Sequence, residues 1–262
     1  MPTKYFLFLS FLYVALLPSV SHAQKPEKTS PLKNKKVLYV YGGWEGHEPQ
    51  QSLDIFIPWL KSEGAEVIVS NTLDSYLNEE LMESLDLIIQ VWSMGKISSA
   101  QEKILLKTVE NGCGFAGWHG GIGDSFREST KYQFMVGGQW VAHPGNIIDY
   151  RVRITDQNDE ITKGFQDFSM VSEQYYMHVD PNVKVLATTT FSGKDAPWIE
   201  GAVMPVVWKK YYGKGRIFHS TLGHVMEDFE VYEAFEIQKR GIRWAAQSKY
   251  APAEKWISPA YR

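Results

Sequence analysis

Histidine is the residue type in this sequence with the widest choice of chemistry. The chain of 262 residues contains seven histidines, and four of them stand next to glycine or proline: His47, His119, His143 and His224. Imidazole titrates near neutral pH and binds divalent metals, so a group of such residues can carry protons or hold a cation. Taken one at a time, each is better explained as a surface or hydrogen-bonded loop residue. Four together favour a site.

The segment around His119 has a distinctive pattern. It reads Gly117-Trp118-His119-Gly120-Gly121 at the end of a short apolar run. A sharp turn from strand to helix, with a glycine two residues to either side, usually presents a nucleophilic Ser or Cys. Here the central residue is histidine, so the sequence predicts the turn without its nucleophile.

The only cysteine, Cys113, lies six residues before His119 in the same apolar run. A small buried side chain explains it better than a reactive thiol. A single cysteine also leaves no intramolecular disulfide to form.

The elements that must position these residues alternate between strand and helix patterns. A capping box, Ser99-x-x-Glu102, opens one helix, and Gly112 closes it. The first half predicts strands at 36–41, 66–70, 85–92 and 114–118 and helices at 50–63 and 99–111. The second half predicts strands at 147–154, 168–171, 183–189, 204–209 and 216–220 and a closing helix at 229–246. Apolar strands alternating with helices predict a doubly wound α/β domain around a parallel sheet, with additional strands in the C-terminal half.

Composition and the chain ends narrow the class of protein. The net charge of −3, without a basic run, argues against nucleic-acid binding. Residues 1–23 combine a lysine, a short apolar run and Ser21-His22-Ala23, as in a secretory signal peptide with no lipobox cysteine. We therefore expect a signal peptide over 1–23, a flexible lead-in over 24–34, one domain over 35–249 and a tail over 250–262. No membrane insertion is expected after cleavage.

Ligands of open parallel sheets bind beyond the carboxyl ends of the strands, where the glycine-rich loops of this chain are predicted. Glu173 and Tyr175 lie in a further loop there. Three interpretations stay open: a divalent metal such as zinc on the histidines, acid/base catalysis by one of them, or hydrogen bonding to a polar ligand. We favour acid/base chemistry with no cofactor. Loop tryptophans, namely Trp44, Trp118, Trp140 and Trp198, favour a sugar ligand, although core packing is the commoner role of tryptophan.

Several enzyme signatures are missing from the sequence. The loop Gly42-Gly43-Trp44-Glu45-Gly46 does not match G-x-G-x-x-G, and neither a phosphate-binding P-loop nor G-x-S-x-G occurs. A nicotinamide dehydrogenase is therefore excluded as the expected class.

The motifs taken together resemble the trehalose-utilisation, or ThuA-like, family over nearly the whole mature domain. The motifs are Gly42-Gly43 with His47, Gly117 to Gly121, Gly137-Gly138 with His143-Pro144, Glu173 to Tyr176, Pro205 to Trp208, and Gly213 to Phe218 with Gly223-His224. The resemblance implies a flavodoxin-like sheet of the class I glutamine amidotransferase-like superfamily and a role in catabolism of oxidised disaccharides such as 3-keto-trehalose. Amidotransferase relatives carry a catalytic cysteine where this chain has His119, so amidotransferase activity is not expected. A functional link to a sugar oxidoreductase is expected instead.

The resulting expectation is a periplasmic or secreted ThuA-like protein acting on a small carbohydrate. His119, His224 and Glu173 are the expected catalytic residues, and the position of His224 resembles that of the catalytic histidine in the amidotransferases. The expected substrate-binding residues are Trp44, His47, Trp118, Gly120, Trp140, His143 and Tyr175. A metal, if bound, would lie on His47, His119 and His143. The alternatives are a non-catalytic sugar-binding module and a metal-dependent sugar hydrolase or lyase.

Overall fold

The computed structural model describes residues 1–4 and 29–255. Most of the predicted signal peptide and the end of the predicted tail, residues 256–262, lie outside the described residues. None of the helices within the described ranges is long and apolar enough to cross a membrane.

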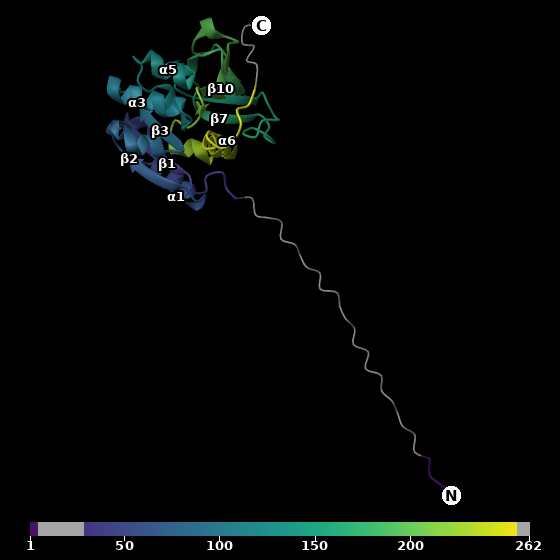
Figure 1. Ribbon diagram of the computed structural model, residues 1–262. Helices are drawn as coiled ribbons and strands as arrows, with labels where there is room; N and C mark the ends of the chain where they lie inside the picture. The colour runs from purple at the N-terminus through teal and green to yellow at the C-terminus, as the bar shows by residue number, and fades with distance from the viewer. Residues whose placement is uncertain (5–28, 256–262) are drawn as a thin grey trace.

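One large sheet forms the centre of the domain (Figure 1). It has nine strands in the order β2-β1-β3-β4-β11-β10-β9-β6-β7. The strands are β1 (Lys36–Gly43), β2 (Glu66–Ser70), β3 (Leu87–Ser93), β4 (Gly114–Trp118), β6 (Ile147–Ile154), β7 (Phe168–Glu173), β9 (Lys184–Thr190), β10 (Val203–Tyr212) and β11 (Gly215–Ser220). All nine were expected from the apolar runs, with ends that differ by up to three residues.

The predicted α/β fold is confirmed, but the sheet is mixed rather than mostly parallel. Strands β2, β1, β3, β4 and β11 pair in parallel, in the order typical of flavodoxin-like proteins. Every pair from β11 through to β7 is antiparallel. The connections between β6, β7, β9, β10 and β11 contain no crossover helix. Strands joined without such a helix pair with their neighbours in antiparallel fashion.

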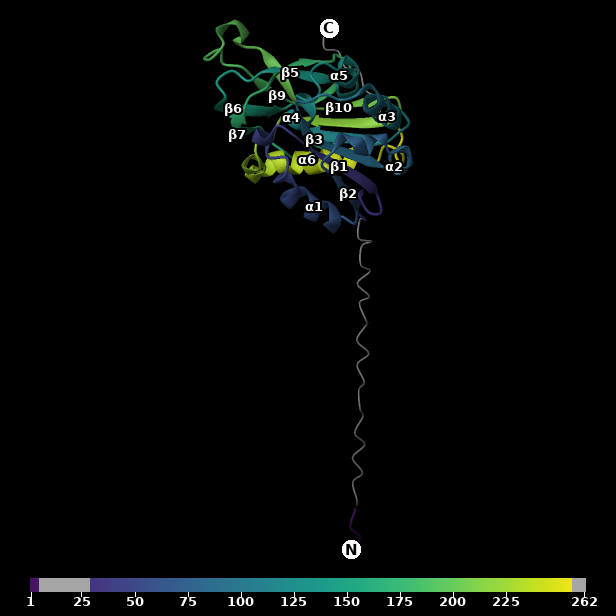
Figure 2. The same cartoon turned by 90° about the vertical axis from the view of Figure 1, so that its left-hand side faces the viewer.

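Helices cover both faces of the sheet because its central strands are apolar on both faces (Figure 2). On β1, Val37 and Tyr39 face one core while Leu38 and Val40 face the other. Helices α1 (Ser52–Ser62) and α6 (Tyr232–Ala245) pack on the first face. Helices α2 (Glu79–Ser84), α3 (Ser99–Glu110) and α5 (Thr130–Val136) pack on the second.

Several short elements were not expected. Two strands, β5 (Gly138–Ala142) and β8 (Tyr176–Val179), form a separate antiparallel pair where loops were predicted. The other additions are three short helices, α2, α4 (Gly120–Gly123) and α5, and four 3-10 helices: η1 (Glu45–His47), η2 (Leu73–Leu77), η3 (Pro197–Ile199) and η4 (Met226–Glu230). The capping box of α3 is formed by Ser98 and Gln101, one residue earlier than predicted.

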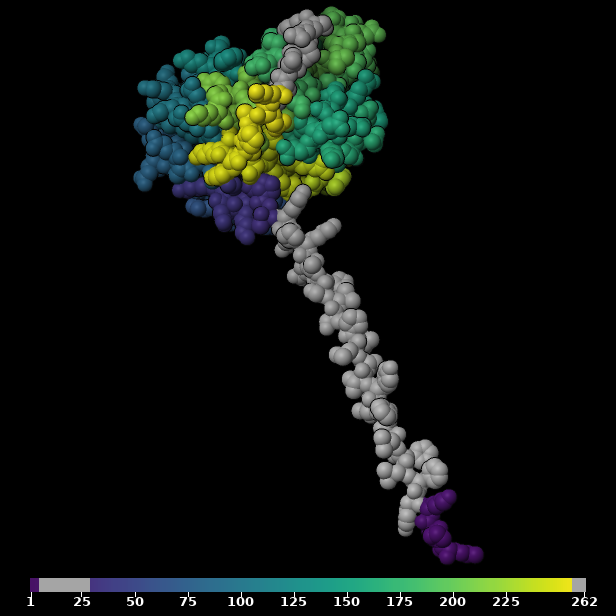
Figure 3. All heavy atoms as spheres, turned by 45° about the vertical axis from the view of Figure 1, so that its right-hand side comes forward, coloured from purple at the N-terminus to yellow at the C-terminus, as the bar shows by residue number. Residues whose placement is uncertain are grey.

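Both described ends of the domain pack against its body (Figure 3). Leu32, predicted to lie in a flexible lead-in, is fully buried in the core beside α1. In the predicted tail, Glu254 accepts hydrogen bonds from Lys209 and from the indole of Trp244. The folded domain therefore extends beyond 35–249 at each end.

Candidate functional site

The candidate site lies where the parallel strands end. β1 leads into η1 and His47, β3 ends at Ser93, and β4 leads to His119. The order of the sheet places β2 and β3 on opposite sides of β1, so the crossovers diverge at this edge. Such a switch point is where open α/β sheets bind their ligands.

His119 occupies the predicted turn between β4 and α4 in a backbone conformation that is rare for a side-chain-bearing residue. Its φ is 47° and its ψ is −134°, and such strain is retained mainly at functional sites. The turn is held because the His119 N–H donates to the carbonyl of Ser220 at 2.7 Å. The following residue must be glycine, since a Cβ on Gly120 would overlap the ring of His47.

Four histidines converge on one carboxylate, that of Glu173 at the end of β7. Nε2 of His119 lies 3.0 Å from Glu173 Oε2, Nδ1 of His224 lies 3.3 Å from it and Nε2 of His47 lies 4.0 Å from it. On the other carboxylate oxygen, Nδ1 of His143 lies 3.6 Å from Oε1. One ligand atom from each of His47, His119, Glu173 and His224 lies within 4.8 Å of all the others. We call these four residues the His–Glu cluster.

The tautomer of His119 follows from its partners. Nδ1 of His119 lies 2.8 Å from the carbonyl oxygen of Thr221. A carbonyl only accepts hydrogen bonds, so Nδ1 carries the proton and Nε2 of the neutral ring bears a lone pair. That lone pair points at Glu173 Oε2. The two acceptors therefore require a proton or a cation between them.

Burial favours the uncharged form of the His47 and His119 rings. Burial, helped by the neighbouring His119 and His224, lowers the pKa of His47 to about 2. Burial also lowers the pKa of His119. For Glu173, burial acts to raise the pKa, but the imidazoles of His119 and His224 outweigh it and the net pKa is well below the usual range. The neutral rings of His47 and His119 are therefore favoured beside an ionised Glu173.

Two further nitrogens face Glu173 without a well-aligned hydrogen bond. Nδ1 of His143 and Nδ1 of His224 are buried, and the Glu173 oxygens that they face lie 3.6 and 3.3 Å away. Buried polar atoms are almost always hydrogen-bonded, so these two atoms are candidates to contact a ligand or an ion. Nδ1 of His47, in contrast, lies 2.6 Å from the hydroxyl of Ser93, which fixes its ring.

Aromatic side chains form one wall of the cluster. The ring of Tyr175 lies over His119 with centroids 3.9 Å apart, and Trp140 lies 5.6 Å from the ring of His143. The guanidinium of Arg127 sits over Trp140 at 4.5 Å and is anchored by two hydrogen bonds to Asp124. On the other side, the half-exposed Trp44 contacts His47 edge to face at 4.6 Å.

Some predicted site residues lie elsewhere. Trp118 ends β4 rather than lying in a loop, is buried in the core and stacks on Phe56 at 4.3 Å. Gly120 provides clearance for His47. Trp198 is 84% exposed in η3, in the connection between β9 and β10. His219 is fully buried against Trp208.

The sequence analysis did not assign roles to three residues that hold the site together. Ser93 orients His47. Its position as the last residue of a buried strand was the one feature of the sequence that could have indicated this role. Asp228 accepts from the backbone N–H of His224 at 2.7 Å and from the Ser172 hydroxyl at 2.6 Å, and so ties the His224 loop to β7. No sequence pattern pairs Asp228 with Ser172, since 56 residues separate them.

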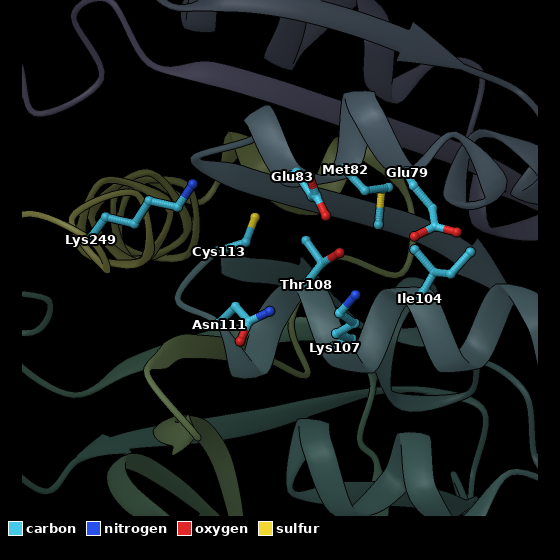
Figure 4. A pocket seen from close by; sticks show the side chains of 9 residues that line it. All are labelled: Glu79, Met82, Glu83, Ile104, Lys107, Thr108, Asn111, Cys113 and Lys249. Carbon is cyan, nitrogen blue, oxygen red and sulfur yellow. The ribbon is translucent and has the colours of Figure 1, made fainter.

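A second pocket lies at the opposite edge of the sheet, where β4 begins (Figure 4). It has a volume of about 120 Å³ and is lined by residues of α2 and α3 together with Cys113 and Lys249. Burial raises the pKa of Cys113 to about 12. The thiol is therefore protonated near neutral pH, as the sequence analysis expected of an unreactive cysteine.

The fold and the site together define an α/β domain with a histidine–carboxylate cluster at the carboxyl edge of its sheet. The chain belongs to the ThuA family, described as trehalose utilisation, whose model matches residues 36–245. The expected family is thereby confirmed, and with it a role related to carbohydrate use.

Solved structures show the same fold. A ThuA-like protein from Bacteroides uniformis is 18% identical, with a TM-score of 0.70 over 86% of this chain and 95% of its own. One from Parabacteroides merdae is also 18% identical, with a TM-score of 0.64 over 82% of this chain and 90% of its own. A cytoplasmic protein from Salmonella typhimurium is 12% identical, with a TM-score of 0.56 over 82% of this chain and 98% of its own. No curated protein matches the chain.

Proposed function

We propose that this protein is an exported enzyme of carbohydrate catabolism in which the His–Glu cluster holds a divalent cation and acts on a sugar, such as a 3-keto-disaccharide of the trehalose type. The family's link to trehalose utilisation supports the substrate class. One observation carries the mechanism: the 3.0 Å contact between the Nε2 lone pair of His119 and Glu173 Oε2.

A cation between His119 Nε2 and Glu173 Oε2 would stabilise their contact better than a shared proton would. A proton shared between the two atoms would make His119 an imidazolium in a fully enclosed position, and burial disfavours this form. A divalent cation instead uses neutral imidazoles and an ionised carboxylate, the states that burial and the neighbouring groups favour here. On this ground we propose a bound cation, in place of the metal-free acid/base chemistry expected from the sequence.

The donor set suits zinc or a similar ion. Three imidazole nitrogens and one carboxylate oxygen are ligands of Zn²⁺ and of neighbouring transition metals. Ligands about 2.1 Å from a tetrahedral ion stand about 3.4 Å from one another, whereas the cluster atoms lie within 4.8 Å. Small side-chain shifts would close that difference. His224 and Glu173 replace His143 in the ligand set expected from the sequence.

The remaining residues supply positioning and proton transfer. When bound, the cation would polarise a sugar oxygen. A carbonyl at C3 of a sugar makes the C–H bond at C2 acidic. Transfer of that proton to a base forms a double bond between C1 and C2 and breaks the bond from C1 to the glycosidic oxygen. The leaving oxygen then takes up the proton that the base has removed. His143 is the candidate base, since its side chain is 28% exposed and its Nδ1 lies 3.6 Å from Glu173 Oε1.

Export and superfamily are part of the same proposal. The pattern of residues 1–23 supports a cleaved signal peptide and a periplasmic or secreted protein. The elbow conformation of His119 after β4 supports a place in the class I glutamine amidotransferase-like superfamily.

The experiment combines elemental analysis with a product assay. Protein purified without chelator is analysed for metals and then incubated with trehalose and 3-keto-trehalose, and the products are followed by mass spectrometry. We expect about one equivalent of metal and cleavage of the keto sugar. Cleavage by metal-free protein would contradict the metal and support acid/base catalysis, and tight binding without product would support a non-catalytic sugar-binding module.

A further inference from the structure

A hollow of about 630 Å³ adjoins the His–Glu cluster and has not been assigned a role above. It lies between the edge strand β7, the start of β6, and the segment from His224 to Val231. Its volume falls within the range of about 300 to 1,000 Å³ that is usual for ligand pockets. His224 belongs to both sites: its ring lines the hollow, and its Nδ1 lies 3.3 Å from Glu173 Oε2.

The wall of the hollow is held by specific contacts. Asp228 is buried and accepts hydrogen bonds from the N–H of His224 and the hydroxyl of Ser172. Two residues after His224, the N–H of Met226 donates to Glu48 Oε2 at 2.7 Å. The backbone beside the hollow is therefore tied to β7 and to the loop after β1, which carries His47. A ligand in the hollow would meet a surface that is already formed.

The lining combines exposed aliphatic groups with free carboxylates. Ile147 on β6 and Val171 on β7 are 51% and 65% exposed, an unusual position for large aliphatic side chains. Glu227 and Glu230 are exposed and lie in the same hollow. Of the described residues that line it, none is lysine or arginine.

This combination matches a neutral sugar ring. A pyranose has C–H faces that pack on aliphatic side chains and a rim of hydroxyl groups that donate hydrogen bonds to carboxylates. A phosphate or uronate group would instead lie near the negative charges of Glu227 and Glu230, with no lysine or arginine of the lining to pair with. Contact between like charges is unfavourable.

We propose that this hollow binds the second unit of an uncharged disaccharide whose first unit lies at the His–Glu cluster, and that Glu227 and Glu230 exclude phosphorylated sugars. The proposal rests on the proposed function, because it takes the cluster as the reacting centre. It makes Glu227 and Glu230 specificity residues and Val171 part of the surface that recognises the leaving group.

Two variants and a matched control test the proposal. Val171→Trp narrows the hollow. Glu227→Gln with Glu230→Gln removes two charges while keeping hydrogen-bonding groups. Glu80→Gln with Glu83→Gln removes two exposed charges from α2, at the other edge of the sheet. Binding of glucose, trehalose and trehalose 6-phosphate is measured by calorimetry for each protein, together with its metal content.

We expect Val171→Trp to weaken trehalose binding by about tenfold or more while glucose binding and metal content stay as in the wild type. The Glu227/Glu230 variant should improve binding of trehalose 6-phosphate relative to trehalose by about tenfold, and the α2 control should leave that ratio unchanged. The inference is overturned if Val171→Trp binds trehalose as the wild type does, or if both charge variants give the same ratio.

The readouts separate this inference from the function on which it rests. If the protein holds no metal and His119→Ala still cleaves the keto sugar, the proposed function fails. If metal binding and cleavage are normal but the hollow variants do not discriminate disaccharide from monosaccharide, only the hollow is wrongly assigned.

Discussion

The two ends of β4 carry the two residues of this chain that most resemble catalytic groups, and they differ in what faces them. Cys113 precedes the strand and His119 follows it, and each is only 1% exposed. Around the thiol the structure offers a small pocket formed by helical side chains. Around the imidazole it offers a carboxylate and three more imidazoles. Equal burial therefore produces an inert thiol at one end and a ligand cluster at the other.

The direction of the strand explains the difference. At the beginning of β4 the chain arrives from α3, and the space is filled by helix packing. At its end the loops of β1, β3, β4 and β11 diverge and leave room for side chains from several strands. A turn from strand to helix that presents a nucleophile in other α/β enzymes can present an imidazole here, because the loop geometry, and not the nucleophile, creates the site.

The largest expected effect comes from His119→Ala, which removes the central imidazole. Turnover of the keto sugar should fall by about three orders of magnitude or more, since each tenfold loss corresponds to about 1.4 kcal/mol of transition-state stabilisation. Metal content should fall with it. The melting temperature of the metal-free protein should change much less than turnover does, because removal of the ring also removes the unfavourable contact between its Nε2 lone pair and Glu173. Enzyme assay, elemental analysis and calorimetry test this, and a large loss of stability with retained activity would refute the role.

Removal of the proposed metal tests whether it binds at the His119 end of β4. A ligand present at about 1,000 times its Kd stabilises a folded protein by about 4 kcal/mol, which in a domain of this size corresponds to about 10 °C in Tm. We expect a chelator to lower the Tm of the wild type by that order and to leave the Tm of His119→Ala unchanged. Scanning calorimetry with and without chelator measures both. Equal shifts in the two proteins would show that the cation binds elsewhere.

Ser93→Ala tests whether orienting His47 matters. The Ser93 hydroxyl fixes the His47 ring at 2.6 Å, on the side away from Glu173. Groups that hold a metal ligand in place are typically worth about 10- to 100-fold in metal affinity. We expect a loss in that range, with Ser129→Ala, on α5's N-cap, as a control. Competition titration with a fluorescent chelator measures it. Unchanged affinity would remove Ser93 from the site.

Sequence reasoning found the partners in this cluster but not their arrangement. His47, His119 and His224 follow recognisable strand patterns, so their convergence could be inferred from the rules of parallel sheets. Glu173 ends a strand in the antiparallel half, where the sequence gives no register. The ligand set expected from the sequence therefore contained His143 and not His224. Trp118 was misplaced because a strand's last residue can point to either face of the sheet.

The pH dependence of stability tests a histidine that is buried but lies outside the His–Glu cluster. His219 is buried beside Trp208, outside the cluster, and burial lowers its pKa to about 3. The unfolded chain binds a proton below about pH 6.5 and the folded chain does not. Stability is thus fully present above pH 6.5 and falls by up to about 1.4 kcal/mol per pH unit toward pH 3. In denaturant titrations, His219→Gln should show a shallower acid loss, and an unchanged slope would contradict the assignment.

The smallest expected effect is at the inert end of β4. Cys113→Ala removes one buried sulfur atom, and small truncations of this kind cost about 1 kcal/mol, or about 2 to 4 °C in Tm for a domain of this size. Because Cys113 lies at the opposite end of β4 from His119, metal content and turnover should equal those of the wild type. The assay is run on Cys113→Ala and His119→Ala side by side. If Cys113→Ala lost activity while keeping its metal and its fold, the proposed contrast between the two ends of β4 would be wrong. The thiol would then contribute to the reaction despite lying at the end of β4 opposite His119.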